Sequence, residues 1–273
     1  GDVSSTCARS MLAALDAGIA ASGALVLHGQ PAWQYDLGAA LKRSSRSPAA
    51  KYLQLATVTP AGLPAVRTVV FRGWLWNTCT LMMITDARSS KLQDIAAQKR
   101  CEIAWYLEKT REQFRIQGDM RAVYPDEDNP KLCRARETVW RNLSDSARAQ
   151  FNDITPGVPI GDLPALLPGD GAAPGAGGEP SVIPLAPAPA KFAAPADIGT
   201  APADTAAIPP ASPNFVLLLL RPDAVDQLRL SRPQRRWLHT IPPGAPGLEP
   251  PGETAAAEDA AAAAAWKVQE VTP

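Results

Sequence analysis

Cations and hydroxyl groups gather at two neighbouring places in the first half of the sequence. Arg67 and Arg72 lie at the ends of the run RTVVFR, and the stretch Arg88 to Lys91 (RSSK) follows the run TLMMITD. Arginine offers a planar fork that matches phosphate oxygens, lysine offers a point charge, and serine hydroxyls and the first amides of a helix add neutral donors. These residue types at this spacing indicate a site for a phosphate group.

Both groups of residues also have simpler interpretations. Arg67 and Arg72 alone could be the solvated ends of an ordinary strand. Arg88, Ser89 and Lys91 alone could begin a capped helix with a charged face. Considered separately, the two groups leave the phosphate site and these structural roles open.

The apolar and β-branched residues between the cations predict two strands. Val69 to Phe71 suit a pleated, half-buried surface, and Trp74 to Thr78 form a turn that folds TLMMITD back beside RTVVFR. A helix that begins near Ser89 or Ser90 follows the second strand. The sequence therefore predicts a hairpin that brings both groups of cations to one place.

Further elements flank this hairpin. Trp33, Leu37 and Leu41 recur at fourth-residue spacing and predict a covering helix over residues 33–46. Three strands in succession, joined by short turns, indicate an antiparallel meander. Other strands are predicted over residues 52–58, 101–107, 112–124, 235–241 and 266–271 and from Asn214 onward, and other helical segments over 5–21, 92–98 and 126–151.

Composition excludes several classes of protein. The 273 residues carry 27 Lys and Arg against 27 Asp and Glu, so the chain lacks the basic surface of a nucleic-acid-binding protein. Four cysteines without a CxxC pair and only two histidines argue against a zinc site, a disulfide framework and a Ser-His-Asp triad, so no catalytic or metal-binding residue is assigned. No apolar run approaches the roughly 20 residues that span a membrane. We therefore expect a soluble protein.

Two stretches of low complexity interrupt the folded sequence. Residues 155–213 hold half of the 28 prolines, and residues 242–265 are also rich in Pro, Gly and Ala. Such sequences bury too little apolar surface to offset the entropy lost on ordering, so we expect disordered insertions. Strand-like sequence lies on both sides of each insertion. We therefore expect one domain, built from residues 51–154, 214–241 and a closing strand at 266–273, with a helical cover at 1–50.

This pattern points to a mainly β fold with peripheral helices. About seven or eight strands favour a small closed barrel, because closure removes exposed strand edges. Several short motifs then occur in an order that resembles a known family. They are QLATV at 54–58, RTVVFRG at 67–73, ITDARSSK at 84–91, AWY at 104–106, REQFRIQG at 111–118 and the closing Trp266.

These motifs are similar to those of the pyridoxamine 5'-phosphate oxidase-like family, more narrowly its FMN-binding branch of cyanobacteria and plants. The resemblance implies an antiparallel split β-barrel, usually a homodimer that holds FMN between its subunits. In the family's order and spacing, the cations and hydroxyl groups favour FMN over the simpler interpretations. The cofactor-binding residues that the resemblance and its neighbourhood imply are Arg67, Thr68, Val69, Val70, Phe71, Arg72, Ile84, Thr85, Arg88, Ser89, Ser90, Lys91, Gln113 and Arg236.

The chain departs from the family at some of these positions. The family's first FMN strand ends in lysine where this chain has Arg72, and the family has arginine where this chain has Ser90. Arg88, two residues earlier, could supply that guanidinium. Gln113 is a flavin contact in the family, although a glutamine on a strand is also an ordinary part of a polar face.

The substrate side departs further. The family's RLH signature reads Arg232, Pro233 and Gln234 in this chain, and a helix that grips the substrate phosphate has changed residue types. Its positions fall near Trp140, Ser144 and Arg148. The candidate substrate residues are Arg72, Arg148 and Arg232.

The resemblance implies an FMN-dependent oxidoreductase of vitamin B6 metabolism, which oxidises pyridoxamine or pyridoxine phosphate to pyridoxal 5'-phosphate with dioxygen. In such an enzyme the flavin supplies the redox chemistry, while the protein supplies position and electrostatics. The changed substrate positions motivate an alternative, an FMN-binding protein without that activity, acting as a flavin carrier or sensor or as an NAD(P)H-dependent reductase. The sequence begins at Gly1 without an initiating methionine. Cytoplasm and chloroplast therefore both stay open as locations.

Overall fold

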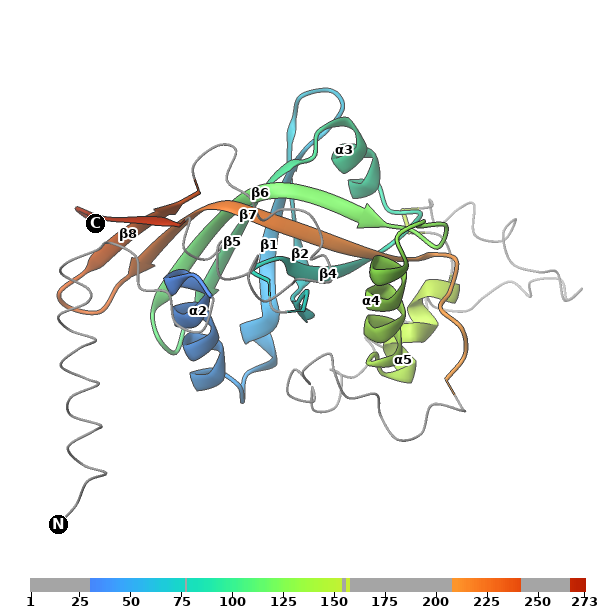
Figure 1. Cartoon of the computed structure of the whole chain (residues 1–273), viewed down its shortest axis with the longest axis horizontal. Coiled ribbons are helices and arrows are strands. Elements are labelled where there is room, and N and C mark those ends of the chain that lie inside the picture. Colours follow the sequence, from blue (N-terminus) through green and yellow to red (C-terminus); the bar gives the residue numbers. More distant parts are fainter. Residues whose placement is uncertain (1–29, 77, 154–155, 158–207, 242–265) are drawn as a thin grey trace, which may run out of the picture.

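The computed structural model describes residues 30–76, 78–153, 156–157, 208–241 and 266–273. The predicted helix over 5–21, most of the insertion at 155–213 and the whole of 242–265 lie outside these residues. Within the described part, nine antiparallel strands form one sheet with few helices (Figure 1). They are β1 (Tyr52–Val58), β2 (Pro64–Val70), β3 (Gly73–Trp74), β4 (Leu81–Asp86), β5 (Arg100–Leu107), β6 (Glu112–Val123), β7 (Phe215–Arg229), β8 (Arg235–Thr240) and β9 (Lys267–Val271), with helices α2 (Ala32–Arg43), α3 (Lys91–Ala97), α4 (Pro130–Arg141) and α5 (Asp145–Ala149).

The strand order closes the sheet into a barrel with a gap. The order is β2-β1-β5-β6-β7-β4-β3, and β8 pairs with both β7 and β9. The two ends of this path meet where the amide of Arg72, just after β2, donates to the carbonyl of Met82 in β4 at 2.8 Å. No ladder joins the rest of β2 to β4 within the described residues. The predicted split barrel is therefore confirmed, with its split between β2 and β4.

The predicted hairpin of RTVVFR and TLMMITD is wrong in its pairing. β2 pairs along its whole length with β1, so that Leu55 lies opposite Arg67. β4 pairs with β7 instead, from Leu81 opposite Leu220 to Asp86 opposite Phe215. Only the two-residue strand β3, which follows RTVVFR in the chain, pairs with β4 as the other arm of a short hairpin. The pairing differs because the split lies between β2 and β4. Each of these two strands is hydrogen-bonded along its length to the strand on its other side, β1 or β7.

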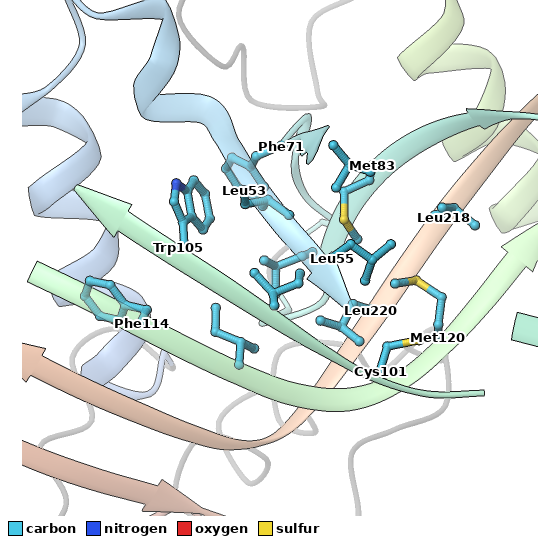
Figure 2. Packing of buried hydrophobic residues seen from close by; sticks show 14 of the residues in the cluster. Leu53, Leu55, Phe71, Met83, Cys101, Trp105, Phe114, Met120, Leu218 and Leu220 are labelled. Atoms are coloured by element: carbon cyan, nitrogen blue, oxygen red, sulfur yellow. The ribbon is translucent and has the colours of Figure 1, made fainter. Parts of the chain in front are cut away.

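The long strand β7 (Figure 1) contributes side chains to two hydrophobic clusters. Its residues 216, 218 and 220 face the barrel interior with Leu53, Trp105 and Phe114, and Figure 2 shows this packing. Residues 215, 217 and 219 face the other way, toward Trp140 and other residues of α4. Side chains alternate between the faces of a strand, so a strand covered on both faces reads as a continuous apolar run. The run FVLLLL is explained by this double burial.

The helix α4 is fixed to the sheet by a buried arginine. The Arg136 guanidinium donates to the carbonyls of Phe215 and Ser212, both at 2.9 Å, and lies over the Phe215 ring. The Trp140 indole donates to the Pro209 carbonyl at 2.9 Å. Residues 208–213, whose composition placed them in the disordered insertion, thus contact α4 directly. Residues 208–213 are therefore part of the folded structure, because backbone carbonyls there satisfy buried donors.

The helix α2 is joined to the sheet by a chain of buried polar groups. The Gln227 side chain donates through Nε2 to the Asp36 carboxylate at 2.9 Å, and its Oε1 lies 3.2 Å from His239 Nε2. Because Oε1 can only accept, His239 carries its proton on Nε2. The other ring nitrogen, Nδ1, is buried without a hydrogen-bond partner in the described residues. A second proton on this ring would have no acceptor.

Acid should therefore destabilise the fold through His239. Burial lowers the pKa of His239 to about 4, against a smaller opposing influence of Asp226. As the pH falls, the unfolded chain binds this proton at a higher pH than the folded protein does. The free energy of unfolding therefore has its full value above pH 6.5 and falls by up to about 3 kcal/mol as the pH drops to about 4. Burial raises the pKa of Asp36, which works in the opposite direction at the acidic end.

The test is chemical denaturation of the parent and of His239→Gln at several pH values from 7.5 to 4. The amide keeps a donor toward Gln227 but does not titrate, so the pH slope should flatten in the variant. Equal slopes in the two proteins would show that another group causes the acid sensitivity.

Candidate functional site

Four residues form what we call the cationic corner: Arg67 of β2, Thr85 of β4, and Ser89 and Lys91 at the start of α3. The ammonium Nζ of Lys91 donates to the Thr85 hydroxyl at 2.8 Å and to the Ser89 hydroxyl at 2.5 Å. Burial lowers the pKa of Lys91, and the neighbouring positive charge of Arg67 lowers it further. The structure therefore holds two cations close together across the split, where an anion would stabilise both.

Arg67 is held from the core side of the sheet. Its Nη1 donates to Thr57 Oγ1 at 2.5 Å and its Nη2 donates to Asp94 Oδ2 at 3.1 Å. The Thr57 hydroxyl in turn donates to the same Asp94 oxygen at 2.7 Å. Arginine has five N–H donors in a planar fork, and its side chain is 23% exposed. The other donors of Arg67 are therefore available to a ligand on its open side.

Arg88 is directed away from the cationic corner. Its backbone amide, Nε and Nη2 all donate to the carboxylate of Asp86, and Nη1 donates to the carbonyl of Asp153 at 2.9 Å. Burial alone would raise the pKa of Asp86, but these bonds from Arg88 lower it overall. We expected Arg88 to supply the guanidinium that the family has at the position of Ser90. In this structure, however, the Arg88 guanidinium is already bonded to Asp86. Ser90 precedes α3 and is exposed, without a side-chain capping bond.

The strand between the cations alternates as the sequence predicts. Val69 and Phe71 are buried, whereas Thr68 is exposed on the outer face and Val70 is half-buried. Burial lowers the pKa of Arg72. Ile84, on the other side of the split, is half-buried opposite Leu217. These residues lie in or next to β2 and β4, the two strands that flank the split.

Gln113 and Arg236 lie elsewhere. Both are opposite Leu228, one on β6 and the other on β8, and they share the outer face of the sheet with Tyr106, which is opposite Gln113. Arg236 donates twice to the Asp226 carboxylate, at 2.9 Å each, and Arg115 bonds to the same carboxylate. Within this chain, therefore, these two predicted flavin contacts do not meet the cationic corner.

The predicted substrate residues are also separated. Arg148 on α5 donates to the carbonyls of Trp140, Arg141 and Leu143, so it caps the end of α4. Arg232 is exposed in the turn between β7 and β8. Of the three candidates, only Arg72 adjoins the split.

Sequence reasoning missed Thr57 and Asp94, which both contact Arg67. Asp94 lies three positions after Lys91 and therefore on the same face of α3, a spacing that could have indicated it. Thr57 lies on the buried face of β1, in alternation with Leu53 and Leu55. Its polarity among apolar neighbours was the available signal, because buried hydroxyl groups are almost always hydrogen-bonded.

The donor set fits a phosphate monoester such as that of FMN. A guanidinium, an ammonium and hydroxyl groups from Thr85 and Ser89 converge on the split, and these groups form the short, charge-assisted bonds that phosphate oxygens accept. Among the described residues, no group of three or more His, Cys, Asp or Glu side chains could hold a metal ion. None of the described helices is long and apolar enough to cross a membrane.

Comparisons with known proteins identify the family of this chain. The sequence model of the family "Pyridoxamine 5'-phosphate oxidase, FMN-binding domain" matches residues 30–124. The chain is 28% identical over 212 residues to Pyridoxine/pyridoxamine 5'-phosphate oxidase 2 of Arabidopsis thaliana, covering 78% of this chain and 90% of that protein.

Solved structures extend the comparison to the fold. A pyridoxamine 5'-phosphate oxidase-related, FMN-binding protein from Nostoc punctiforme superimposes with a TM-score of 0.61 at 35% identity, covering 89% of this chain and 97% of that one. PhzG from Burkholderia lata, at 16% identity and a TM-score of 0.55, shares the fold. Similarity of sequence and fold over nearly the whole length of the Nostoc protein, together with the cationic corner, shows that this chain belongs to the pyridoxamine 5'-phosphate oxidase-like family of FMN-binding proteins.

Proposed function

We propose that this protein is an FMN-dependent oxidase that converts pyridoxamine or pyridoxine 5'-phosphate to pyridoxal 5'-phosphate with dioxygen. The observation that carries the proposal is the cationic corner at the split of the barrel, in a chain whose family binds FMN. The name of the Arabidopsis relative supports the choice of substrate. FMN, when bound, supplies the two-electron oxidation, and the protein supplies binding and orientation.

In this proposal Arg67 and Lys91 bind the phosphate of FMN, and Thr85 and Ser89 orient Lys91 toward it. The hydroxyl groups hold the ammonium at a fixed position, because Nζ donates to both of them. Residues 68–72 run along the split from Arg67 to Arg72 and lie beside the rest of the cofactor. Arg88 acts indirectly, since its bonds to Asp86 fix the turn that carries Ser89 and Ser90.

The remaining flavin contacts come from a second copy of the chain. Thr85 is opposite Val216 of β7, whereas Gln113 and Arg236 are both opposite Leu228, twelve residues further along that strand. At about 3.3 Å per residue, this separation reaches up to about 40 Å along β7, which is longer than one flavin. We therefore do not expect one chain to bring both sets to the same FMN. Two chains that face each other across the outer surface of the sheet can do so.

A second candidate function follows from the substrate side. Arg148, a predicted substrate residue, is occupied by the carbonyls at the end of α4 and by Asp145. Trp140 is buried and bonded to Pro209. These engagements favour an FMN-binding protein that acts on a different substrate or carries the flavin.

The two functions are separated by an assay of the purified, FMN-loaded protein with pyridoxamine phosphate and pyridoxine phosphate. The oxidase should form one pyridoxal 5'-phosphate for each dioxygen consumed. Unphosphorylated pyridoxine should react far more slowly, because it lacks the anion that Arg72 would bind. Tight FMN binding without turnover of either phosphate would instead support the second candidate.

A further inference from the structure

Asp94 places a carboxylate directly against the cationic corner. Its Oδ2 accepts a hydrogen bond from the Thr57 hydroxyl and another from Arg67, and its side chain is only 7% exposed. Asp86, the other acidic residue beside the corner, is paired with Arg88. Asp94 is therefore the counter-ion of Arg67, the cation that the phosphate of FMN also requires.

We propose that Asp94 is a built-in counter-ion of Arg67 whose negative charge opposes the binding of the FMN phosphate beside it, and thereby sets the affinity and phosphate selectivity of the site. This inference rests on the proposed FMN site. A carboxylate and a phosphate dianion repel each other, and the repulsion is strong where water is largely excluded. The phosphate therefore binds more weakly beside Asp94 than it would beside a neutral residue of the same shape.

The same residue has the opposite effect on the protein without FMN. A partly buried arginine that loses its carboxylate is left with an uncompensated charge, which destabilises the fold. When FMN binds, its phosphate supplies the missing negative charge. The two effects are linked. The free energy by which Asp94 stabilises the folded apoprotein is offset, in part, when FMN binds, and it therefore lowers the affinity for FMN. Asp94 thus keeps the empty site folded and makes cofactor binding reversible.

The test is a titration of the apoprotein of the parent and of Asp94→Asn with FMN and with riboflavin. Asparagine keeps the acceptor for Thr57 and Arg67 but removes the charge. FMN should bind Asp94→Asn about tenfold more tightly than the parent, since one decade corresponds to about 1.4 kcal/mol. Riboflavin, which lacks the phosphate, should bind both proteins equally. The apoprotein of the variant should melt below that of the parent, and FMN should close most of this gap.

Two controls separate charge from packing. Thr57→Val removes the hydroxyl that bonds to both Asp94 and Arg67 but keeps the negative charge beside Arg67, so it should not tighten FMN binding. Asp223→Asn removes a carboxylate that pairs with Arg100 at the surface and should leave both flavins unaffected. A tightening in either control would assign the effect to loosened packing or to net charge, and would overturn the proposal.

The remaining outcomes are also decisive. If the parent binds FMN but Asp94→Asn binds it with equal or lower affinity, or binds riboflavin more tightly as well, the charge of Asp94 does not oppose the phosphate. If Asp94→Asn and Asp94→Gln fail to fold alone, folding on addition of FMN but not of riboflavin supports the proposal, and failure with both contradicts it. Absence of FMN binding by the parent would reject the proposed function, and the inference with it.

Discussion

Replacement of Lys91 with alanine should weaken FMN binding by at least about tenfold while leaving riboflavin binding unchanged. The phosphate loses a charge-assisted bond to a partly buried ammonium, and such bonds contribute about 1.5 to 3 kcal/mol, or one to two decades of affinity. The Thr85 and Ser89 hydroxyl groups, which Lys91 bonds in the structure, cannot replace its charge. Fluorescence titration of the apoprotein with each flavin measures both affinities.

Three further variants sharpen this prediction. Lys91→Arg keeps the charge and should lose less affinity. Arg67→Ala should also weaken FMN selectively, but it leaves the buried Asp94 without its partner, so its effect combines binding with stability. Arg88→Ala removes a guanidinium that is bonded to Asp86 and supports the turn carrying Ser89, so it should weaken FMN binding less than Lys91→Ala does. An equal loss of FMN affinity in Arg88→Ala and Lys91→Ala would contradict the assignment of the cationic corner.

Val66→Glu should convert the protein to a monomer that no longer retains FMN. Val66 is 66% exposed on the outer face of β2, diagonal to the exposed Val58 of β1, and the exposed Tyr52 of β1 and Tyr106 of β5 lie further along the same face. Exposed apolar and aromatic side chains that share one face of a sheet indicate an interaction surface. If two copies pair there, the glutamates are buried without partners, and each such charge costs several kcal/mol. The dimer dissociation constant should rise at least about a hundredfold.

Light scattering after size-exclusion chromatography gives the assembly state, and the absorbance of the eluted flavin gives the retained FMN. Tyr124→Glu is the control, because Tyr124 is also exposed but lies beyond β6 on the way to α4. The Tyr124→Glu protein should remain dimeric and retain its FMN. A Val66→Glu protein that stays dimeric and keeps its FMN would place the partner on a different surface.

Much of the fold follows from local patterns in the sequence. Alternation of apolar and polar residues over 52–58 and 112–123 defines β1 and β6 almost to the residue, because one face of each strand is buried. Pairing could not be predicted in the same way. β4 pairs with β7, whose residues lie more than a hundred positions away, and the doubly buried run FVLLLL carries no alternation that specifies a partner.

The candidate site shows the same division. The cations and hydroxyl groups of residues 67–72 and 88–91 led to the prediction of a phosphate site, and the family resemblance added Thr85. The bonds of Arg88 to Asp86 and of Arg67 to Asp94 depend on side-chain directions at a turn and between elements. Sequence spacing can show that such residues are neighbours, but it does not show which carboxylate pairs with which guanidinium.

The central claim is that the cationic corner recognises the phosphate of FMN in a site shared by two chains. Isothermal titration of the unmodified, flavin-free protein with FMN and with riboflavin tests it most directly. The account predicts one FMN per chain, two per dimer, bound at least about tenfold more tightly than riboflavin, because only FMN offers a phosphate to Arg67 and Lys91. Equal affinity for the two flavins would contradict it.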